Sequence, residues 1–346
     1  MKKKISVLIC DDSVLVRQIL SNVLGSDPQI EIVGLAENPL IAREMIKQFN
    51  PDVLTLDVEM PEMDGLSFLE KIMALRPMPV VMISSLTQKG TAQTLRALEM
   101  GACDVVGKPT YDLKVHFHTM RHEIINKVKA AATARVRASV ILSRQAAGVA
   151  RPMSKIELIC IGASTGGVAA IKSVLPLLPE NSPPILMVQH MPASYTASFA
   201  NRLDGASRIS VVESEDGMLL EPGKAIIACG AFHARIVARG GNYYIKHGED
   251  PEISGHKPSV DAMFESAAEV VSANVVGVIM TGMGRDGARG MLALRRKGAF
   301  TLGQTEESCV VYGMPKVAKE VGGVEREVSL SMLATEIEKI CWPAHI

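Results

Sequence analysis

Apolar residues along the first 125 positions follow two alternating patterns. Short runs of consecutive apolar residues, typical of buried strands, alternate with stretches whose apolar residues recur at helical spacing. The predicted strands are Val7–Cys10, Ile30–Ala36, Val53–Asp57, Val80–Ser84 and Val105–Gly107. The predicted helices lie near Val14–Leu24, Pro39–Phe49, Leu66–Leu75 and Thr91–Met100, with a last one from about Leu113. This alternation predicts βαβ units and a parallel sheet.

The alternation resumes at Glu157. Strands are predicted at Leu158–Ile161, Ile185–Gln189, Ala225–Ala228 and Val275–Met280, with another near Phe300. Helices are predicted at Gly167–Leu177, Ala193–Leu203, Val260–Ser272 and Ala288–Lys297. The stretch ARIVARGGNYYIKH predicts an inserted β-hairpin that turns at Gly240-Gly241-Asn242. We therefore expect a second, doubly wound and mostly parallel α/β domain.

A basic segment separates the two patterned regions, with no acidic residue between Glu123 and Glu157. Its alanine-rich start can extend the last helix of the first domain, and its end, QAAGVARPMSK, is typical of a flexible linker. We predict domains at residues 1–125 and 155–346 and a linker at 126–154. The linker is either a solvated connector or a docking segment for an acidic partner or for the other domain.

The composition of the chain favours a soluble two-domain protein over a nucleic-acid-binding, disulfide-rich or membrane-inserted one. The chain has 346 residues, of which 47% are hydrophobic and 21% charged, and this suits two soluble domains. Lys+Arg and Asp+Glu both number 37, and this balance argues against a nucleic-acid binder. None of the six cysteines forms a CxxC pair, so reduced thiols are expected rather than disulfides or a zinc site. The N-terminal apolar run Ile5–Cys10 is too short for a signal peptide and no run reaches membrane-spanning length, so we expect a cytoplasmic protein without membrane insertion.

Polar residues end four predicted strands of the first domain: Asp11 and Asp12, Asp57, Ser84, and Lys108. The carboxyl ends of parallel strands meet at one edge of a sheet, so these side chains should lie together. Three carboxylates repel one another, and Mg²⁺ relieves that repulsion. One carboxylate can then attack a phosphoryl group whose oxygens the lysine and the serine hold. Singly, the Asp pair could cap the next helix and Asp57 could be a turn residue.

With the motif MPEMDG after Asp57, the region from Lys4 to about Ile125 resembles the receiver domain of response regulators. The resemblance implies a flavodoxin-like (βα)5 fold and phosphorylation of Asp57 by a histidine kinase. It also implies that Mg²⁺ is held by Asp11, Asp12, Asp57 and the backbone carbonyl of Glu59. Receivers often carry a switch aromatic two or three positions before the lysine. Val105 and Val106 occupy those positions here, so the coupling is expected to differ in detail.

The turn GASTGG, which begins at Gly162, is compatible with three chemistries. A phosphate loop is disfavoured because Val168 and Ala169 replace its lysine and hydroxyl residue, and a dinucleotide loop because Ser164 replaces its second glycine. The remaining template, GxSxG between a strand and a helix, exposes a nucleophilic serine and lets the N–H of Thr165 donate to an oxyanion. The alternative is that Ser164 or Thr165 merely caps the helix.

A serine nucleophile needs a base and a group that orients the base. His190 ends the next predicted strand, and Asp286 follows a later one, so both lie at the edge of the sheet that carries Ser164. Alternatively, His190 is a partly buried histidine with its hydrogen bonds satisfied, and Asp286 caps the helix that begins near Gly287. The order Ser, His, Asp differs from that of the α/β-hydrolases, so a different fold is expected.

The region from about Leu158 to Ala318 resembles the catalytic domain of chemotaxis protein-glutamate methylesterases. The matching motifs are GASTGG, QHMP, HKPSVDAMFESAA, TGMGRDG and ESCVVYGMP. The resemblance implies that Ser164 attacks the methyl ester of a receptor glutamate, or a glutamine amide, with His190 as base and Asp286 as its orienting group. The backbone N–H groups of Thr165 and Met283 would stabilise the oxyanion, and hydrolysis would need no cofactor.

The resemblance also implies partners and regulation. Chemoreceptor cytoplasmic domains would be the substrates and a histidine kinase the phosphodonor. Because one chain carries both a phosphoacceptor site and a hydrolase site, we further expect that phosphorylation uncovers the serine cleft. His256 is expected to border that cleft, and Cys229 replaces a family proline in the loop before His233. One alternative is a paralogous serine esterase or amidase of another protein or small molecule under two-component control. Another is a scaffold without catalysis.

Overall fold

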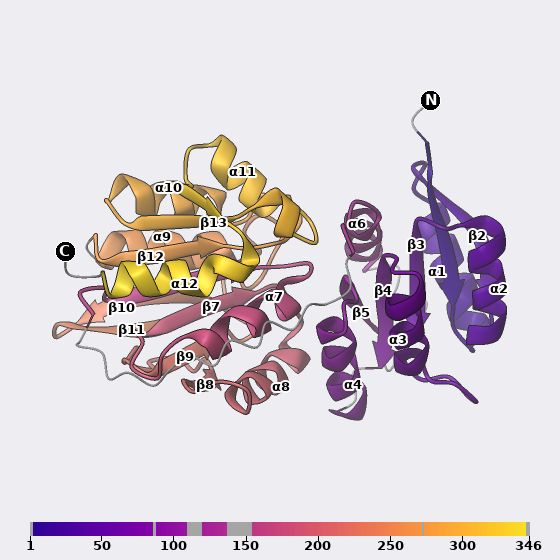
Figure 1. Ribbon diagram of the computed structural model, residues 1–346, viewed down its shortest axis with the longest axis horizontal. Coiled ribbons are helices and arrows are strands. Elements are labelled where there is room, and N and C mark those ends of the chain that lie inside the picture. The colour runs from indigo at the N-terminus through magenta and orange to yellow at the C-terminus, as the bar shows by residue number, and fades with distance from the viewer. Residues whose placement is uncertain (1–2, 86–87, 109–119, 137–153, 272, 344–346) are drawn as a thin grey trace. The chain divides into compact units, whose positions relative to one another are not determined.

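The computed structural model describes residues 3–85, 88–108, 120–136, 154–271 and 273–343 (Figure 1). The chain forms two compact units, Met1–Val140 and Ile141–Ile346, and each is described by itself. Most of the predicted linker, residues 137–153, and the predicted start of the last receiver helix near Leu113 lie outside the described residues. No described helix combines the length and the apolar character needed to cross a membrane.

The first unit is a five-stranded parallel sheet in the order β2-β1-β3-β4-β5. The strands are β1 (Ile5–Cys10), β2 (Ile30–Ala36), β3 (Val53–Asp57), β4 (Val80–Ser85) and β5 (Asp104–Lys108). The helices are α1 (Val14–Gly25), α2 (Pro39–Phe49), α3 (Gly65–Leu75), α4 (Gln88–Glu99) and α6 (Arg121–Ala132). Each predicted strand is confirmed within two residues. For the inner strands the reason is that a strand buried on both faces is a continuous apolar run in the sequence, whereas β2 is a partly exposed edge strand.

The second unit contains a seven-stranded parallel sheet in the order β14-β13-β12-β6-β7-β9-β8. Its strands are β6 (Leu158–Ala163), β7 (Ile185–Gln189), β8 (Ser210–Glu213), β9 (Lys224–Ile227), β12 (Val275–Ile279), β13 (Phe300–Gln304) and β14 (Arg326–Val328). Its helices are α7 (Gly167–Val174), α8 (Ala193–Asp204), α9 (Val260–Val270), α10 (Ala288–Arg296), α11 (Met314–Glu320) and α12 (Leu330–Cys341). The chain changes direction across the sheet between β6 and β12, and ligands bind at such points in open α/β sheets.

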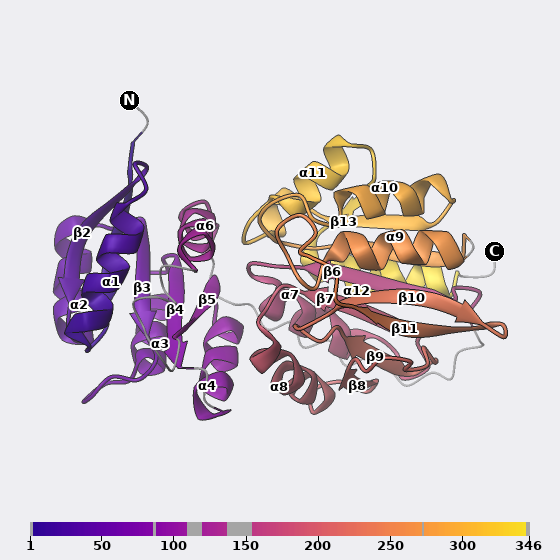
Figure 2. The same cartoon turned by 180° about the vertical axis from the view of Figure 1, so that it is seen from behind.

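The predicted hairpin is confirmed as β10 (His233–Arg239) paired antiparallel with β11 (Asn242–Gly248). Gly240 and Gly241 form its two-residue turn with φ of +57° and +79°, as the tight turns favoured in hairpins require. The hairpin packs along α9 on the side of the sheet that faces the viewer in Figure 2. The pair α7 and α12 covers the side that faces the viewer in Figure 1.

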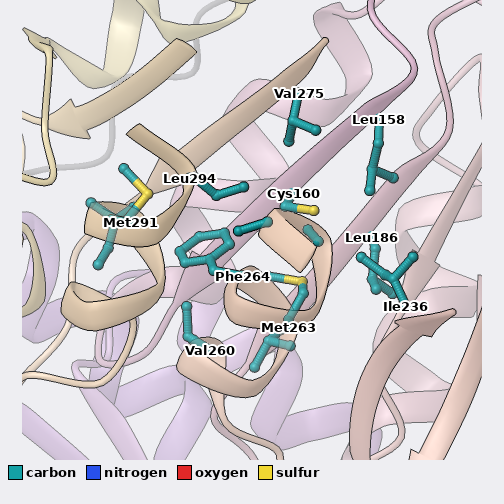
Figure 3. Close-up of a cluster of buried hydrophobic side chains, with 14 of the residues drawn as sticks. Leu158, Cys160, Leu186, Ile236, Val260, Met263, Phe264, Val275, Met291 and Leu294 are labelled. Atoms are coloured by element: carbon teal, nitrogen blue, oxygen red, sulfur yellow. The ribbon is translucent and has the colours of Figure 1, made fainter. Parts of the chain in front are cut away.

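The core of the second unit fixes the position of α9, whose N-terminus proves important for the site. Met263 and Phe264 of α9 are buried against Cys160 of β6, Leu186 of β7 and Leu294 of α10 (Figure 3). Burial of side chains of this size contributes about 1.5–3 kcal/mol each. The helix is therefore held on three sides, and its first turn has a defined place beside the strand ends.

Candidate active site and phosphoacceptor site

Ser164 lies in a tight turn directly after β6. Its N–H donates to the carbonyl of Thr281 (3.0 Å), and its own carbonyl accepts from the N–H of Gly167 (2.7 Å) and from Gln189 Nε2 (2.9 Å). Gly166 has a φ of +78° and is the N-cap of α7, which no side chain caps. The alternative in which Ser164 or Thr165 serves as the helix cap is therefore wrong. The serine is 8% exposed.

His190 follows β7, and its backbone N–H donates to the carbonyl of Ala163 (3.1 Å). Its Nε2 lies 2.9 Å from Asp286 Oδ2. Its other ring nitrogen, Nδ1, is buried and has no hydrogen-bond partner among the described residues. The structure thus brings His190 and Asp286 into contact, and it contains no hydrogen bond from Ser164 to His190. With Nε2–H donating to the carboxylate, Nδ1 keeps the lone pair that can take up a proton.

Asp286 is almost fully buried and accepts three hydrogen bonds besides that of His190. The donors are the hydroxyl of Ser259 (2.7 Å) and the backbone N–H groups of Val260 (2.7 Å) and Asp261 (3.0 Å). Burial raises the pKa of Asp286, but the hydrogen bond and charge of His190, with the hydrogen bonds from Ser259 and the N–H of Asp261, outweigh it and hold the pKa below its usual range. The expected alternative, a cap on the following helix, is wrong: α10 has Gly287 as its N-cap and no side-chain cap, and Asp286 instead accepts from two N–H groups in the first turn of α9.

Asp261 forms the reciprocal contact, which sequence reasoning missed. Its Oδ1 accepts from the N–H of Gly290 in the first turn of α10 (2.9 Å), and Arg289 Nε lies 3.2 Å from Oδ2. Asp286, just before α10, therefore accepts from the first turn of α9, and Asp261, in the first turn of α9, accepts from the first turn of α10. Negative charge is stabilised at helix N-termini. Burial raises the pKa of Asp261, and the charge of Asp286 adds to this. Ser259 before the apolar run of α9 was the available signal for a helix start.

The loops that carry Thr165 and Met283 are held together by hydrogen bonds. The hydroxyl of Thr281 donates to the carbonyl of Thr165 (3.0 Å), and the N–H groups of Gly313 and Met314 donate to the carbonyl of Gly282 (3.0 and 2.8 Å). A Cβ atom at Gly282 would lie 2.7 Å from Cβ of Ser164, so only glycine fits there. The N–H of Met283 has no acceptor within the described parts of the chain, which suits it to a ligand oxyanion.

The remaining histidines of this region have different surroundings. The ring of His256 stacks on that of His190, with centroids 3.8 Å apart and 13° between the planes. His233 is fully buried, with Nε2 at 3.0 Å from the carbonyl of Pro251 and Nδ1 accepting from the N–H of Ser259 (3.1 Å). Cys229 donates its backbone N–H to Ser214 (2.9 Å), and burial raises the pKa of its thiol. His233 and Cys229 therefore support loops around the site.

The acidic residues of the first unit also meet as predicted. Asp11 follows β1 and Asp57 ends β3, and both are buried, whereas Asp12 is exposed. Ligand oxygens of all three lie within 4.8 Å of one another. Lys108 Nζ lies 2.8 Å from Asp11 Oδ2 and 2.7 Å from Asp57 Oδ2. Ser13, not the Asp pair, caps α1, and Asp57 belongs to the strand, so the two structural alternatives are wrong.

The charges in this cluster are only partly compensated. Burial and the neighbouring charge of Asp11 raise the pKa of Asp57 to about 6, with Lys108 acting in the opposite direction. Burial likewise raises the pKa of Asp11. Apart from the Lys108 ammonium, Asp11 Oδ2 has no polar partner among the described residues. An added hard cation would relieve this excess of negative charge, so the three carboxylates fit Mg²⁺.

Further contacts shape the acidic site. Arg17 donates to the carbonyls of Asp11 (2.7 Å) and Asp12 (3.0 Å), a contact that sequence reasoning missed. The N–H of Glu59 donates to Asp57 Oδ1 (3.3 Å), so the residue predicted to offer its carbonyl adjoins the cluster. A Cβ atom at Gly65 would lie 1.9 Å from the carbonyl oxygen of Asp57, which explains the glycine of MPEMDG.

The predicted switch serine, Ser84, is buried next to α4. Thr94 Oγ1 of that helix lies 2.6 Å from Ser84 Oγ and 2.7 Å from the carbonyl of Gly90. Thr94 was not singled out in the sequence, because its contact with Ser84 is tertiary. Val105 and Val106 are both buried, so these positions contribute to the core of the sheet.

Two protein families and several known proteins are similar to this chain. The CheB methylesterase family matches residues 159–337, and the response regulator receiver domain family matches residues 7–119. A protein-glutamate methylesterase/protein-glutamine glutaminase of Caulobacter vibrioides is 53% identical over 337 residues, covering 96% of this chain and 97% of that protein. Its counterpart in Salmonella typhi is 51% identical over 335 residues, covering 96% of both chains.

Similarity to a solved structure covers the second unit. The CheB methylesterase catalytic domain of Thermotoga maritima is 35% identical to the aligned part of this chain, with a TM-score of 0.52. The match covers 53% of this chain and 98% of that domain.

Proposed function

The chain belongs to the CheB family of protein-glutamate methylesterases/protein-glutamine glutaminases with a receiver domain, and we propose how its residues divide catalysis and control. It is a chemotaxis adaptation enzyme that hydrolyses glutamate methyl esters and glutamine amides in proteins. Its substrates are the cytoplasmic domains of chemoreceptors. The observation that carries the assignment of the active site is the His190–Asp286 pair beside Ser164, with Nδ1 of the histidine left for proton transfer.

Ser164 Oγ attacks the ester carbonyl carbon while His190 Nδ1 accepts the hydroxyl proton. The resulting oxyanion accepts hydrogen bonds from the N–H groups of Thr165 and Met283. Collapse of the tetrahedral intermediate breaks the C–O bond to the methoxy group, which leaves as methanol with the proton from His190. With a glutamine substrate, the leaving group is ammonia and the same acyl-enzyme forms.

Water then attacks the acyl-enzyme, and His190 accepts a proton from it. The second tetrahedral intermediate releases Ser164, which takes back its proton from His190, and the product is a glutamate side chain. Asp286 stays ionised throughout, because its hydrogen bonds lower its pKa. It holds Nε2–H of His190 and stabilises the imidazolium that forms twice in each cycle.

Asp57 is the phosphoacceptor, and a histidine kinase is the phosphodonor. Asp11, Asp12, Asp57 and the carbonyl of Glu59 would hold Mg²⁺, which neutralises negative charge on the incoming phosphoryl group when it is bound. Lys108 and Ser84 bind phosphoryl oxygens after transfer. Phosphorylation activates hydrolysis by relieving an inhibition that the unphosphorylated receiver exerts on the serine site. A shortened chain that starts at Ser154 should then be more active than the unphosphorylated full chain.

These assignments are tested by methanol release from membranes that contain methyl-labelled chemoreceptors, with and without a small phosphodonor. The parent, Ser164→Ala and Asp57→Asn proteins are compared. We expect no release by Ser164→Ala and no phosphodonor response in Asp57→Asn. Release by Ser164→Ala would refute the nucleophile, and a response in Asp57→Asn would refute the phosphoacceptor. Equal rates for the shortened and full chains, with no phosphodonor response, would refute inhibition by the receiver.

A further inference from the structure

The proposed base carries a second aromatic ring on one face. The imidazole of His256 lies parallel to that of His190 within 13°, at a centroid separation of 3.8 Å, which is van der Waals contact. Neither transfer of the serine proton nor orientation by Asp286 requires this ring. The His256 ring packs on the side chain that must both accept and return a proton, so a role of His256 would concern how that side chain is held.

The hydrogen bond to Asp286 restrains only one part of the His190 ring. It fixes Nε2, but the terminal torsion of a histidine side chain has a broad energy well, so the plane of the ring can still tilt. Tilting changes the direction in which Nδ1 points. In the described part of the chain, no hydrogen bond to Nδ1 opposes that tilt. A flat ring packed against the face opposes it directly.

The backbone holds His256 in the position that this task needs. Ile253 and His256 exchange two backbone hydrogen bonds, of 3.1 and 3.0 Å. Three residues further on, Ser259 donates its hydroxyl to Asp286 (2.7 Å) and its N–H to the buried ring of His233 (3.1 Å). One short segment, 256–259, therefore places a ring against the base and a hydroxyl against the carboxylate that orients the base.

The acyl-transfer cycle makes the same demand on the ring. His190 becomes an imidazolium in each tetrahedral step and must return its proton from the position in which it accepted it, so the ring has to keep one orientation throughout. We infer that His256 is a positioning residue that keeps the ring of His190 in the plane from which Nδ1 reaches Ser164. This inference rests on the proposed role of His190 as base.

The test uses the full chain, activated with acetyl phosphate, and measures kcat and KM for methanol release from methyl-labelled receptor membranes. His256→Ala should lower kcat by about 10- to 100-fold, because misplacing a reacting group by about 1 Å costs up to that much. KM should stay within about twofold of the parent value, because a positioning residue acts on the base and not on substrate binding. His256→Phe, which keeps a flat ring, should recover most of kcat, whereas His256→Leu, which fills space without one, should not.

Three outcomes would overturn the inference. An unchanged kcat for His256→Ala, or a rise in KM alone, would assign His256 to no role or to substrate binding. Equal recovery by the Phe and Leu variants would show that volume, not stacking, matters. His190→Ala is measured in parallel. If this variant stays active, the proposed base is wrong. If His190→Ala is inactive but His256→Ala keeps the parent kcat, the base stands and only the role of His256 is refuted. Thermal unfolding of each variant establishes that it folds.

Discussion

Two buried carboxylates of this chain, Asp57 and Asp286, lie in similar places but differ in their charge state. Asp57 ends β3 and Asp286 lies in the loop after β12, and both are at most 2% exposed. Burial pushes both pKa values upward. The pKa of Asp57 is raised to about 6, whereas that of Asp286 is held below its usual range. Depth alone therefore does not decide whether a buried carboxylate is charged.

The partners account for the difference. Asp57 faces a second carboxylate, Asp11, and shares with it the single ammonium group of Lys108. Asp286 instead accepts four hydrogen bonds, from His190, Ser259 and two backbone N–H groups at the start of α9. A carboxylate whose two oxygens both accept hydrogen bonds stays ionised and keeps a fixed position, so it can hold the ring of His190. A carboxylate with too little compensation is suited to react once a cation joins the site.

Asp286→Asn is expected to have the largest effect. The amide cannot accept from His190 and from both backbone donors, so kcat for methanol release should fall by about 10⁴-fold. Because the folded pKa of Asp286 is lowered, its ionised form contributes stability above the pKa of the unfolded chain, and this contribution is lost as pH falls through the folded pKa. Urea unfolding should show a less stable variant at pH 7, and the difference should shrink only as pH falls below about 3. A stable, active variant would contradict the anchor role.

Asp57→Asn should change stability with the opposite sign. The folded pKa of about 6 exceeds that of an unfolded aspartate, so the folded protein binds more protons between about pH 4 and 6 and loses stability as pH rises through this range. In the presence of EDTA, the variant should therefore be more stable than the parent by about 2–3 kcal/mol at pH 7 and nearly equal at about pH 4. Urea unfolding of the first unit measures this. A destabilised variant at pH 7 would show that Lys108 already compensates the cluster.

The strands that carry both sites could be predicted because each is a continuous apolar run followed by a polar residue, as in β1, β3, β6 and β7. Among the described strands and α-helices, four were not predicted. The edge strands β8 and β14 are short and only partly buried, and α11 and α12 lie in the last part of the second unit, where no helix was assigned. Short edge strands lack a clear pattern because only part of their surface is covered.

Site residues could be predicted where a strand end or a motif presents them, as for Ser164 and Asp57. The partners that tune them could not, because they are distant in the sequence. Ser259 lies 27 positions before Asp286, and Thr94 reaches Ser84 only through the packing of α4. Sequence periodicity predicts which face of a helix is buried. It does not predict which strand end the first turn of α9 approaches.

Ser259→Ala tests the donors of Asp286 one at a time. The change removes a hydrogen bond to the carboxylate and the N-cap that accepts from the N–H of Ala262 (3.3 Å), so stability should fall by about 1 kcal/mol and kcat roughly tenfold. Ser266→Ala is the matched control on the same helix, since its hydroxyl accepts from Ile236 N–H (3.0 Å) and does not touch Asp286. It should lose similar stability and keep kcat. If Ser259→Ala and Ser266→Ala lost kcat equally, the loss would come from destabilising α9 and not from removing the hydrogen bond to Asp286.

Arg289→Ala should have the smallest effect and shows which contacts hold the two helix N-termini. Arg289 is 64% exposed and pairs with Asp261 Oδ2 at 3.2 Å, while the buried N–H of Gly290 donates to Oδ1 at 2.9 Å. Exposed ion pairs contribute little, so the variant should lose less than about 0.5 kcal/mol, and the difference should vanish in high salt. Asp261→Ala leaves the buried N–H of Gly290 without its acceptor and should cost more than the arginine change in both low and high salt. If the arginine variant were the less stable of the two, the two helix N-termini would depend on a surface ion pair. The buried hydrogen bonds to Asp261 and Asp286 would then not be what holds them in place.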